Sequence, residues 1–151
     1  MKLLKSVLFI LLAFTSVQAI SQETVPLNEP DYNKPRLFAD LPQKMVLNAA
    51  DLDVLFGMPE GTVVNRQVTE QFRLQGTVVS VANGTDVKSV VIRSSNRAGA
   101  VFTFTKVLQA DGSFNYIGRM ISTQHGDAYE IVKENGQYVL NKIGYYDLLA
   151  E

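Results

Sequence analysis

The dipeptide Asn135-Gly136, between two short segments of alternating apolar residues, constrains the fold more than any other feature of the sequence. Asn-Gly favours the backbone of a two-residue hairpin turn, so it predicts two antiparallel strands. Such a turn fixes a register that matches apolar with apolar and aromatic with lysine side chains: Ile131 with Leu140, Val132 with Val139, Tyr129 with Lys142, and Lys133 with Tyr138. The hairpin is therefore predicted together with its register.

Further turns extend this hairpin into a meander. A two-residue turn at Asp111-Gly112 is expected to place Phe102 opposite Ile121, and a four-residue turn over 83–86 is expected to place Val78 opposite Val91. A polar turn over 124–127 leads into the last hairpin. Strands at such regular intervals predict a curled antiparallel β-meander of about six strands. Several strands carry apolar residues on both faces, so the sheet is expected to curl strongly or to close against an N-terminal arm.

One short helix precedes the meander. Asn48 suits the N-cap position, and Leu52, Leu55 and Phe56 form a narrow apolar stripe. Gly57 favours the end of the helix. With this helix packed on the sheet, the predicted fold class is α+β.

The N-terminus has the pattern of a signal peptide. Lys2 and Lys5 precede a short apolar run, and small residues end at Ala19, where cleavage is expected. Residues 20–45 then form a predicted extended, Pro-rich leader arm, and residues 46–151 a single domain. The arm is either a tether or a docking segment, and Leu37, Phe38 and Leu41 could pack onto the domain. The predicted location is secreted or periplasmic.

Composition restricts the chemistry. The sequence has no Cys, which excludes disulfides, Cys-ligated zinc and a thiol nucleophile. Removal of the signal takes away two lysines, which leaves 12 basic and 15 acidic residues. That balance argues against a nucleic-acid partner. No segment of the mature chain is long and apolar enough to predict a transmembrane span.

Few residues suggest a site. The single His, His125, lies in the 124–127 turn near Ser122 and Asp127, and an exposed turn residue is the favoured interpretation over a partner contact or catalysis. Asp51 and Asp53 point to different sides of a helix, so a catalytic pair is not favoured. We predict no catalytic, cofactor-binding or metal-binding residues, and hence no enzyme and no cofactor. The candidate partner contacts are His125, Asp127, Arg97, Tyr145 and Tyr146.

The order of motifs resembles a known region of secreted proteins. A Leu-rich helix over 50–56, a Pro/Gly break over 58–61, and a meander containing Gly112-Ser113-Phe114 and His125-Gly126-Asp127 are similar to the prodomain-like region of secreted bacterial reprolysin-like zinc metalloproteases. The similarity covers about residues 46–149. The chain lacks the His-Glu-x-x-His helix of those enzymes, so the resemblance implies a stand-alone, non-catalytic module.

The expected function is therefore an exported, non-catalytic binding or accessory domain of the bacterial envelope, which binds a protein or restrains a protease. The alternative is a small apolar ligand-binding protein. Its cavity would lie under the curled sheet, where Phe72, Phe102, Phe104, Phe114 and Tyr116 could line it. The sequence leaves the oligomeric state open.

Overall fold

The computed structural model describes residues 33–145 and 147–149. The predicted signal peptide and the arm up to residue 32 lie outside these residues, as does Tyr146. The strands are β1 (Lys44–Val46), β2 (Val63–Gln67), β3 (Arg73–Asn83), β4 (Val87–Ser94), β5 (Ala100–Leu108), β6 (Phe114–Ser122), β7 (Asp127–Glu134) and β8 (Gln137–Gly144). The helical segments are α2 (Ala49–Leu55) and the short 3-10 helix η1 (Asp147–Leu149).

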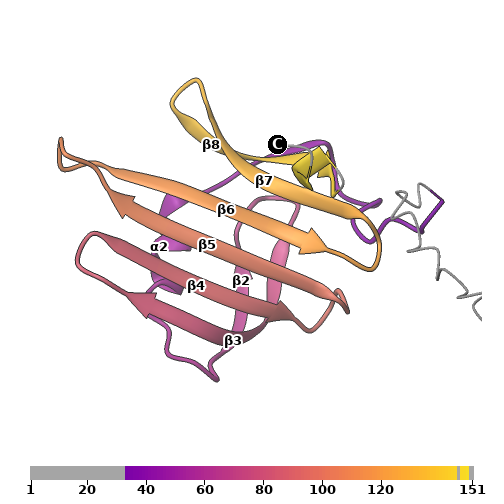
Figure 1. The fold of residues 1–151 in the computed structure, drawn as a ribbon, viewed down its shortest axis with the longest axis horizontal. Coiled ribbons are helices and arrows are strands. Elements are labelled where there is room, and N and C mark those ends of the chain that lie inside the picture. Colours follow the sequence, from indigo (N-terminus) through magenta and orange to yellow (C-terminus); the bar gives the residue numbers. More distant parts are fainter. Residues whose placement is uncertain (1–32, 146, 150–151) are drawn as a thin grey trace, which may run out of the picture.

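All eight strands form one antiparallel sheet in the order β1-β8-β7-β6-β5-β4-β3-β2. Neighbours from β2 to β8 are successive hairpin strands, whereas β1 returns to pair with β8 at the far edge. The chain thus crosses from one edge of the sheet to the other between β1 and β2, and α2 lies on that crossing. In Figure 1, α2 and β2 lie behind β4, β5 and β6, because the sheet curls around them.

The predicted α+β class is wrong, because the described chain is mostly β. Two segments outside the predicted meander, Lys44–Val46 and Val63–Gln67, join the sheet as its edge strands and raise the count from about six to eight. The described residues contain one α-helix, and its seven residues are too few to form a separate layer on the sheet.

The core lies on the concave face of the sheet. Phe102 and Phe104 are completely buried there, and Phe72 packs edge-to-face on Phe102 with 5.7 Å between ring centroids. Gly118 lies opposite Phe104, and a Cβ at Gly118 would come within 2.9 Å of the Phe104 ring. The missing side chain therefore makes room for the aromatic ring.

The predicted register of the last hairpin is confirmed. The structure pairs Ile131 with Leu140 and Tyr129 with Lys142. Asn135 and Gly136 have φ values of 50° and 81°, the left-handed backbone that a two-residue turn needs.

Two other predicted registers are wrong. Phe102 lies opposite Met120, because Gln109 N–H donates to Ser113 O and closes a turn one residue longer than expected. Val78 lies opposite Ile92, because the turn already pairs Ala82 with Ser89, two residues from the expected partner, and a β-bulge between Val78 and Ser80 removes only one residue of that shift.

The predicted helix is confirmed, and its N-cap is Asn48, whose side chain accepts a hydrogen bond from Ala50 N–H. Asp53 fixes the helix to the sheet. Its Oδ1 lies 2.6 Å from Lys106 Nζ and accepts a hydrogen bond of 2.8 Å from the Tyr116 hydroxyl. This carboxylate therefore has a structural role.

Candidate functional site

Residues 36–43, which we call the strap, cross one end of the curled sheet just before β1. Phe38 is completely buried and Leu41 nearly so, and both belong to the core. Phe38 packs edge-to-face on Tyr129 of β7, with 5.6 Å between ring centroids. The boundary predicted between the leader arm (residues 20–45) and the domain (residues 46–151) falls inside β1.

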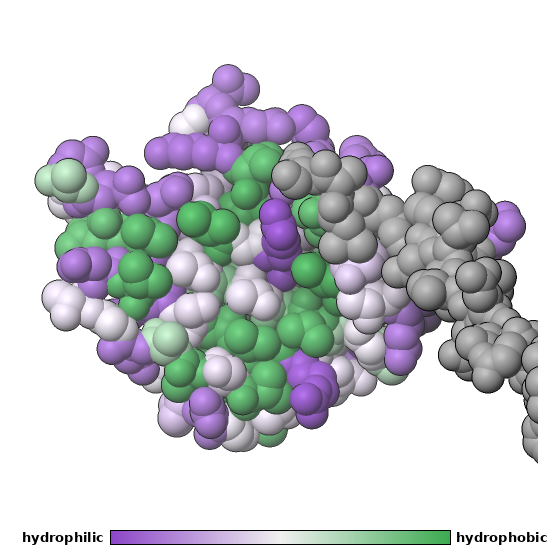
Figure 2. All heavy atoms as spheres, in the orientation of Figure 1, coloured by the Kyte–Doolittle hydropathy of each residue, from purple (hydrophilic) through white to green (hydrophobic). Residues whose placement is uncertain are grey.

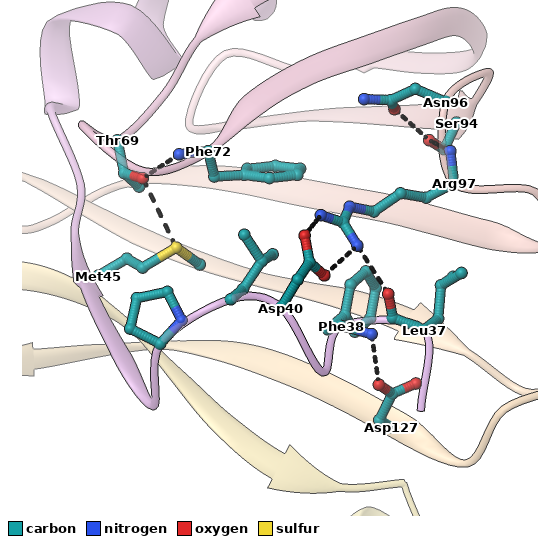
Figure 3. A network of polar contacts seen from close by, with 12 residues as sticks. Leu37, Phe38, Asp40, Met45, Thr69, Phe72, Ser94, Asn96, Arg97 and Asp127 are labelled. Carbon is teal, nitrogen blue, oxygen red and sulfur yellow. Dashed lines mark hydrogen bonds and ion pairs between the residues drawn. The ribbon is translucent and has the colours of Figure 1, made fainter. Parts of the chain in front are cut away.

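Side chains from distant parts of the chain hold the backbone of the strap (Figure 3). Asp127 accepts from Phe38 N–H at 2.7 Å, and Arg97 donates to Leu37 O at 2.6 Å. Lys142 Nζ donates to Phe38 O at 2.7 Å and also to Leu41 O. The Tyr129 hydroxyl donates to Pro42 O. Two of the predicted contact residues, Arg97 and Asp127, therefore meet at the strap.

Arg97 reaches the strap from the loop between β4 and β5. Its two terminal nitrogens lie 2.8 and 2.7 Å from the two carboxylate oxygens of Asp40. The guanidinium also lies 5.7 Å from the ring centroid of Phe38 and 5.9 Å from that of Phe72. Hydrogen bonding to Arg97 lowers the pKa of Asp40, and hydrogen bonding to Asp40 raises the pKa of Arg97.

Asp127 is the most constrained acid of the site. It begins β7 and is only 2% exposed. Its Oδ2 accepts the Phe38 N–H, whereas its Oδ1 is buried and has no hydrogen-bond partner among the described residues. An unmatched buried carboxylate oxygen is costly, so Oδ1 marks a position where a hydrogen-bond donor would stabilise the protein.

Lys142 and Tyr129 complete the polar surroundings of the strap. Burial lowers the pKa of Lys142, whose ammonium lies 5.5 Å from the ring centroid of Tyr129. Burial also raises the pKa of Tyr129 to about 12. Both residues were predicted only as a cross-strand pair. Their contacts with the strap span 101 residues between Lys142 and Leu41 and 87 residues between Tyr129 and Pro42, so local sequence patterns could not predict them.

His125 lies in the β6–β7 turn, as the sequence predicts. Its Nδ1 is 2.7 Å from Ser122 Oγ. Ser122 is completely buried and its backbone O accepts from His125 N–H and Gly126 N–H, so the pair stabilises the turn. A buried hydroxyl is not accessible to a substrate in this arrangement.

Tyr145 follows β8 and is half-buried; its N–H donates to Gly126 O, which also accepts a hydrogen bond of 2.6 Å from Arg36. Gly126 O thus joins the C-terminal segment to the start of the strap. The turn over 124–127 therefore contacts both ends of the described chain.

The concave face is filled by the aromatic residues predicted to line a ligand cavity. Phe72, Phe102, Phe104 and Tyr116 are buried in the core, and Phe114 is 46% exposed at the rim. The larger depressions lie at the surface. One of about 730 Å³ lies between β1, the start of α2 and the β2–β3 turn, and one of about 450 Å³ lies between the strap and β8.

The convex face of the sheet, which we call the outer face, carries a second set of apolar side chains. Val87, Val101 and Ile117 are 44%, 38% and 51% exposed, on the adjacent strands β4, β5 and β6. Arg119 and Glu130 lie opposite each other on β6 and β7 of this face. Figure 2 shows apolar side chains gathered over these strands, with hydrophilic side chains among them.

Within residues 33–145 and 147–149, no three His, Cys, Asp or Glu side chains are grouped so that they could hold a metal ion. None of the helices in the described part of the chain is long and apolar enough to cross a membrane.

A comparison with known proteins matches part of the chain to a protein that is named as an enzyme. No protein-family model matches the chain, and no solved structure matches it. A curated protein named "Putative lipid kinase SH2167", from Staphylococcus haemolyticus (strain JCSC1435), is 33% identical over 70 residues. The match covers 46% of this chain and 23% of that protein, so the chain spans less than a quarter of the relative's length.

Proposed function

We propose that the chain is a non-catalytic binding module, exported to the bacterial envelope as a secreted or periplasmic protein, and that its outer face binds a partner protein. The observation that carries the proposal is the set of exposed apolar side chains Val87, Val101 and Ile117 on three adjacent strands. Val107 lies opposite Val87, and Ile121 lies opposite Val101. Apolar side chains gathered on one face, with polar residues among them, typically mark an interaction site.

The charges of the outer face support a protein partner. Arg119 and Glu130 face each other across β6 and β7, with Thr103 and Asn141 as their outer neighbours across the sheet. Opposite charges beside apolar side chains favour a partner with a complementary pair and disfavour others. The side chains around the strap, by contrast, bind the protein's own backbone. The resemblance to a metalloprotease prodomain-like region supports an exported protease as the partner.

The test compares three versions of the mature protein as baits in the native envelope fraction. Ile117→Lys places a charge in the outer face, and Val63→Lys places the same charge at a residue that is 78% exposed on β2, the far edge of the sheet. We expect a partner that the wild type and Val63→Lys enrich and Ile117→Lys does not. Equal enrichment by all three baits would refute the outer face as the binding surface.

A restraining role is tested with the same variants. Protease activity in the envelope fraction should fall when the wild-type protein is added and should not fall with Ile117→Lys. If partner binding occurs but protease activity is unchanged, the module binds without restraining.

A second candidate function concerns lipids, and the similarity to a protein named as a lipid kinase supports it. In this case the chain binds a lipid at its surface, since aromatic side chains fill the concave face, or takes part in phosphoryl transfer to a lipid. The protein is incubated with ATP and lipid extract, and phosphorylated lipid and sedimentation with vesicles are measured. Absence of both signals would exclude this candidate and leave the binding module.

A further inference from the structure

The depression of about 730 Å³ lies along the free edge of β1. Gln43 O accepts a hydrogen bond from the backbone of β8, and Leu47 N–H donates one to it, so every second residue of this segment turns its backbone groups toward β8. Lys44 and Val46 alternate with these residues, and their N–H and C=O groups therefore point away from the sheet. No strand in the described part of the chain pairs with this edge.

The β2–β3 turn forms the opposite wall of the depression. Asn48 N–H continues the outward alternation of β1 and donates to Val68 O at 3.4 Å. Thr69 Oγ1 donates to Met45 Sδ at 3.6 Å, and Figure 3 shows this contact between the turn and β1. These two contacts hold the walls in place, and the volume is within the range of ligand sites, about 300–1,000 Å³. The unpaired backbone of β1 therefore borders a depression with fixed walls.

The edge of β1 lacks the protection that free sheet edges usually have. A lysine side chain on an edge strand normally keeps other strands away. Lys44 Nζ instead lies 2.8 Å from Glu134 Oε1 on β7, which is the second strand from β1 across the sheet. Val46 is 55% exposed. An exposed apolar side chain beside unpaired backbone groups favours the addition of a further strand.

The charges of the depression favour a basic occupant. Its lining includes two acids, Asp51 in the first turn of α2 and Glu70 in the β2–β3 turn. Among the described residues, neither acid takes part in an ion pair. Lys44 is the cation of the lining, and Glu134 neutralises it. The depression therefore has a net negative charge and complements cationic side chains.

We propose that the free edge of β1 binds an extended basic peptide, which adds to the sheet as an antiparallel strand. The peptide backbone bonds to the N–H and C=O groups of Lys44 and Val46, and its cationic side chains lie near Asp51 and Glu70. Because β1 has only three residues, the main-chain hydrogen bonds are few. The two acids therefore select basic over acidic peptides and contribute part of the affinity.

The test measures the fluorescence anisotropy of a short, labelled, end-blocked peptide of alternating lysine and valine, titrated with the mature protein. We expect saturable binding, and none for the peptide with glutamate in place of lysine. Two further versions carry N-methyl groups on all lysine amides or on all valine amides. Alternate amides of an added strand face β1, so one version should lose about tenfold or more in affinity, as expected for lost hydrogen bonds, and the other should bind normally. Absence of binding, equal affinity of the two methylated versions, or equal binding of the glutamate peptide would overturn the proposal.

Proline substitutions locate the binding on the protein. Val46→Pro removes an outward N–H that β8 does not use, so it should leave the sheet intact and weaken peptide binding by about tenfold or more. Val63→Pro is the matched control. Val78 N–H donates to Thr62 O, so Val63 turns its N–H to the free edge of β2, and this variant should bind as the wild type does. Unchanged affinity in folded Val46→Pro would refute the site.

A charge variant decides the outcome if Val46→Pro does not fold. Asp51→Asn combined with Glu70→Gln leaves the backbone unchanged and should weaken peptide binding by up to about fivefold for each acid, the size of a partly exposed ion pair. Wild-type affinity in this double variant would contradict the role of the acids and overturn the proposal.

Sedimentation of the protein with and without the peptide distinguishes a peptide from a second copy of the chain. A dimer that persists in excess peptide and is lost in Val46→Pro would overturn the proposal in favour of pairing between two β1 strands. The site is also independent of the outer face. Ile117→Lys should lose the protein partner and keep the peptide, whereas Val46→Pro should do the reverse, so the two proposals can fail separately.

Discussion

Arg97 and Asp40 form a two-pronged ion pair across 57 residues of sequence, with nitrogen–oxygen distances of 2.8 and 2.7 Å. The partners differ in environment: the Asp40 side chain is 65% exposed, and that of Arg97 is 16% exposed. Arg97 also donates to Leu37 O and lies over two core aromatic rings. Arg97 therefore stabilises the strap through a backbone hydrogen bond and ring contacts as well as through its ion pair.

Replacing the two partners should have unequal effects on stability. Asp40→Asn should lower the free energy of unfolding by less than about 1 kcal/mol, because exposed ion pairs contribute little. Arg97→Ala should lower it by about 2–3 kcal/mol, because it also removes a buried hydrogen bond and the ring contacts. Urea denaturation measures both, with Arg66→Ala as a control that should change stability by about 0.5 kcal/mol or less. Equal losses for Asp40→Asn and Arg97→Ala would show that the ion pair alone matters.

Phe38 makes the strap part of the core. Phe38→Ala should lower the free energy of unfolding by about 3–5 kcal/mol, as expected for removal of a fully buried aromatic ring. Val63→Ala, at an exposed position, is the control and should have little effect. If Phe38→Ala unfolds no more easily than Val63→Ala, the strap is not part of the cooperative unit.

Gly118 is expected to tolerate no side chain. A Cβ at this position would lie 2.7 Å from Thr103 O and 2.9 Å from the Ile131 side chain. Gly118→Ala should therefore lower the free energy of unfolding by about 1–3 kcal/mol through overpacking. Gly57→Ala is a suitable comparison, because the nearest atom to its Cβ would be Val54 O at an ordinary 3.7 Å. A larger loss in Gly57→Ala would contradict the packing argument.

Two tyrosines should ionise late. Burial raises the pKa of Tyr129 and of Tyr116 from 10.0 to about 12. Because the folded pKa values are raised, the stability that these hydroxyls contribute is fully present below pH 10 and is lost as the pH rises toward 12. Tyrosinate absorbance against pH should show a late step.

Tyr129→Phe provides the control for that titration. It should remove part of the late step and leave the rest, which belongs to Tyr116. A wild-type titration with a single transition near pH 10 in the folded protein would contradict the burial of both hydroxyls.

Local features of the fold could be predicted from sequence, because neighbouring residues determine them. The Asn135-Gly136 turn fixed the β7–β8 register, and Asn48 fixed the start of α2. The bulge after Val78 could not be predicted, since it depends on how β3 bends around the core. The fold class was mistaken for a related reason: β1 has only three residues, and it is recognised as a strand only through its pairing with β8.

In the candidate site, too, the local features could be predicted from sequence and the long-range contacts could not. His125 could be placed in its turn from sequence, and Arg97 and Asp127 stood out as charged residues in loops. Their common contact with the strap could not be foreseen, because Phe38 and Asp127 are 89 residues apart and Leu37 and Arg97 are 60 apart. No sequence pattern predicts that Asp127 Oδ1 is buried without a hydrogen-bond partner among the described residues.

The pairing of β1 with β8 also determines when the domain can complete its fold. Synthesis from the N-terminus produces the strap and β1 first, and Lys142 follows 104 residues after its partner Phe38. Phe38 and Met45 must stay without their final neighbours until the last strand has emerged. Contacts over such long separations form slowly, so the domain closes only after β8 is available.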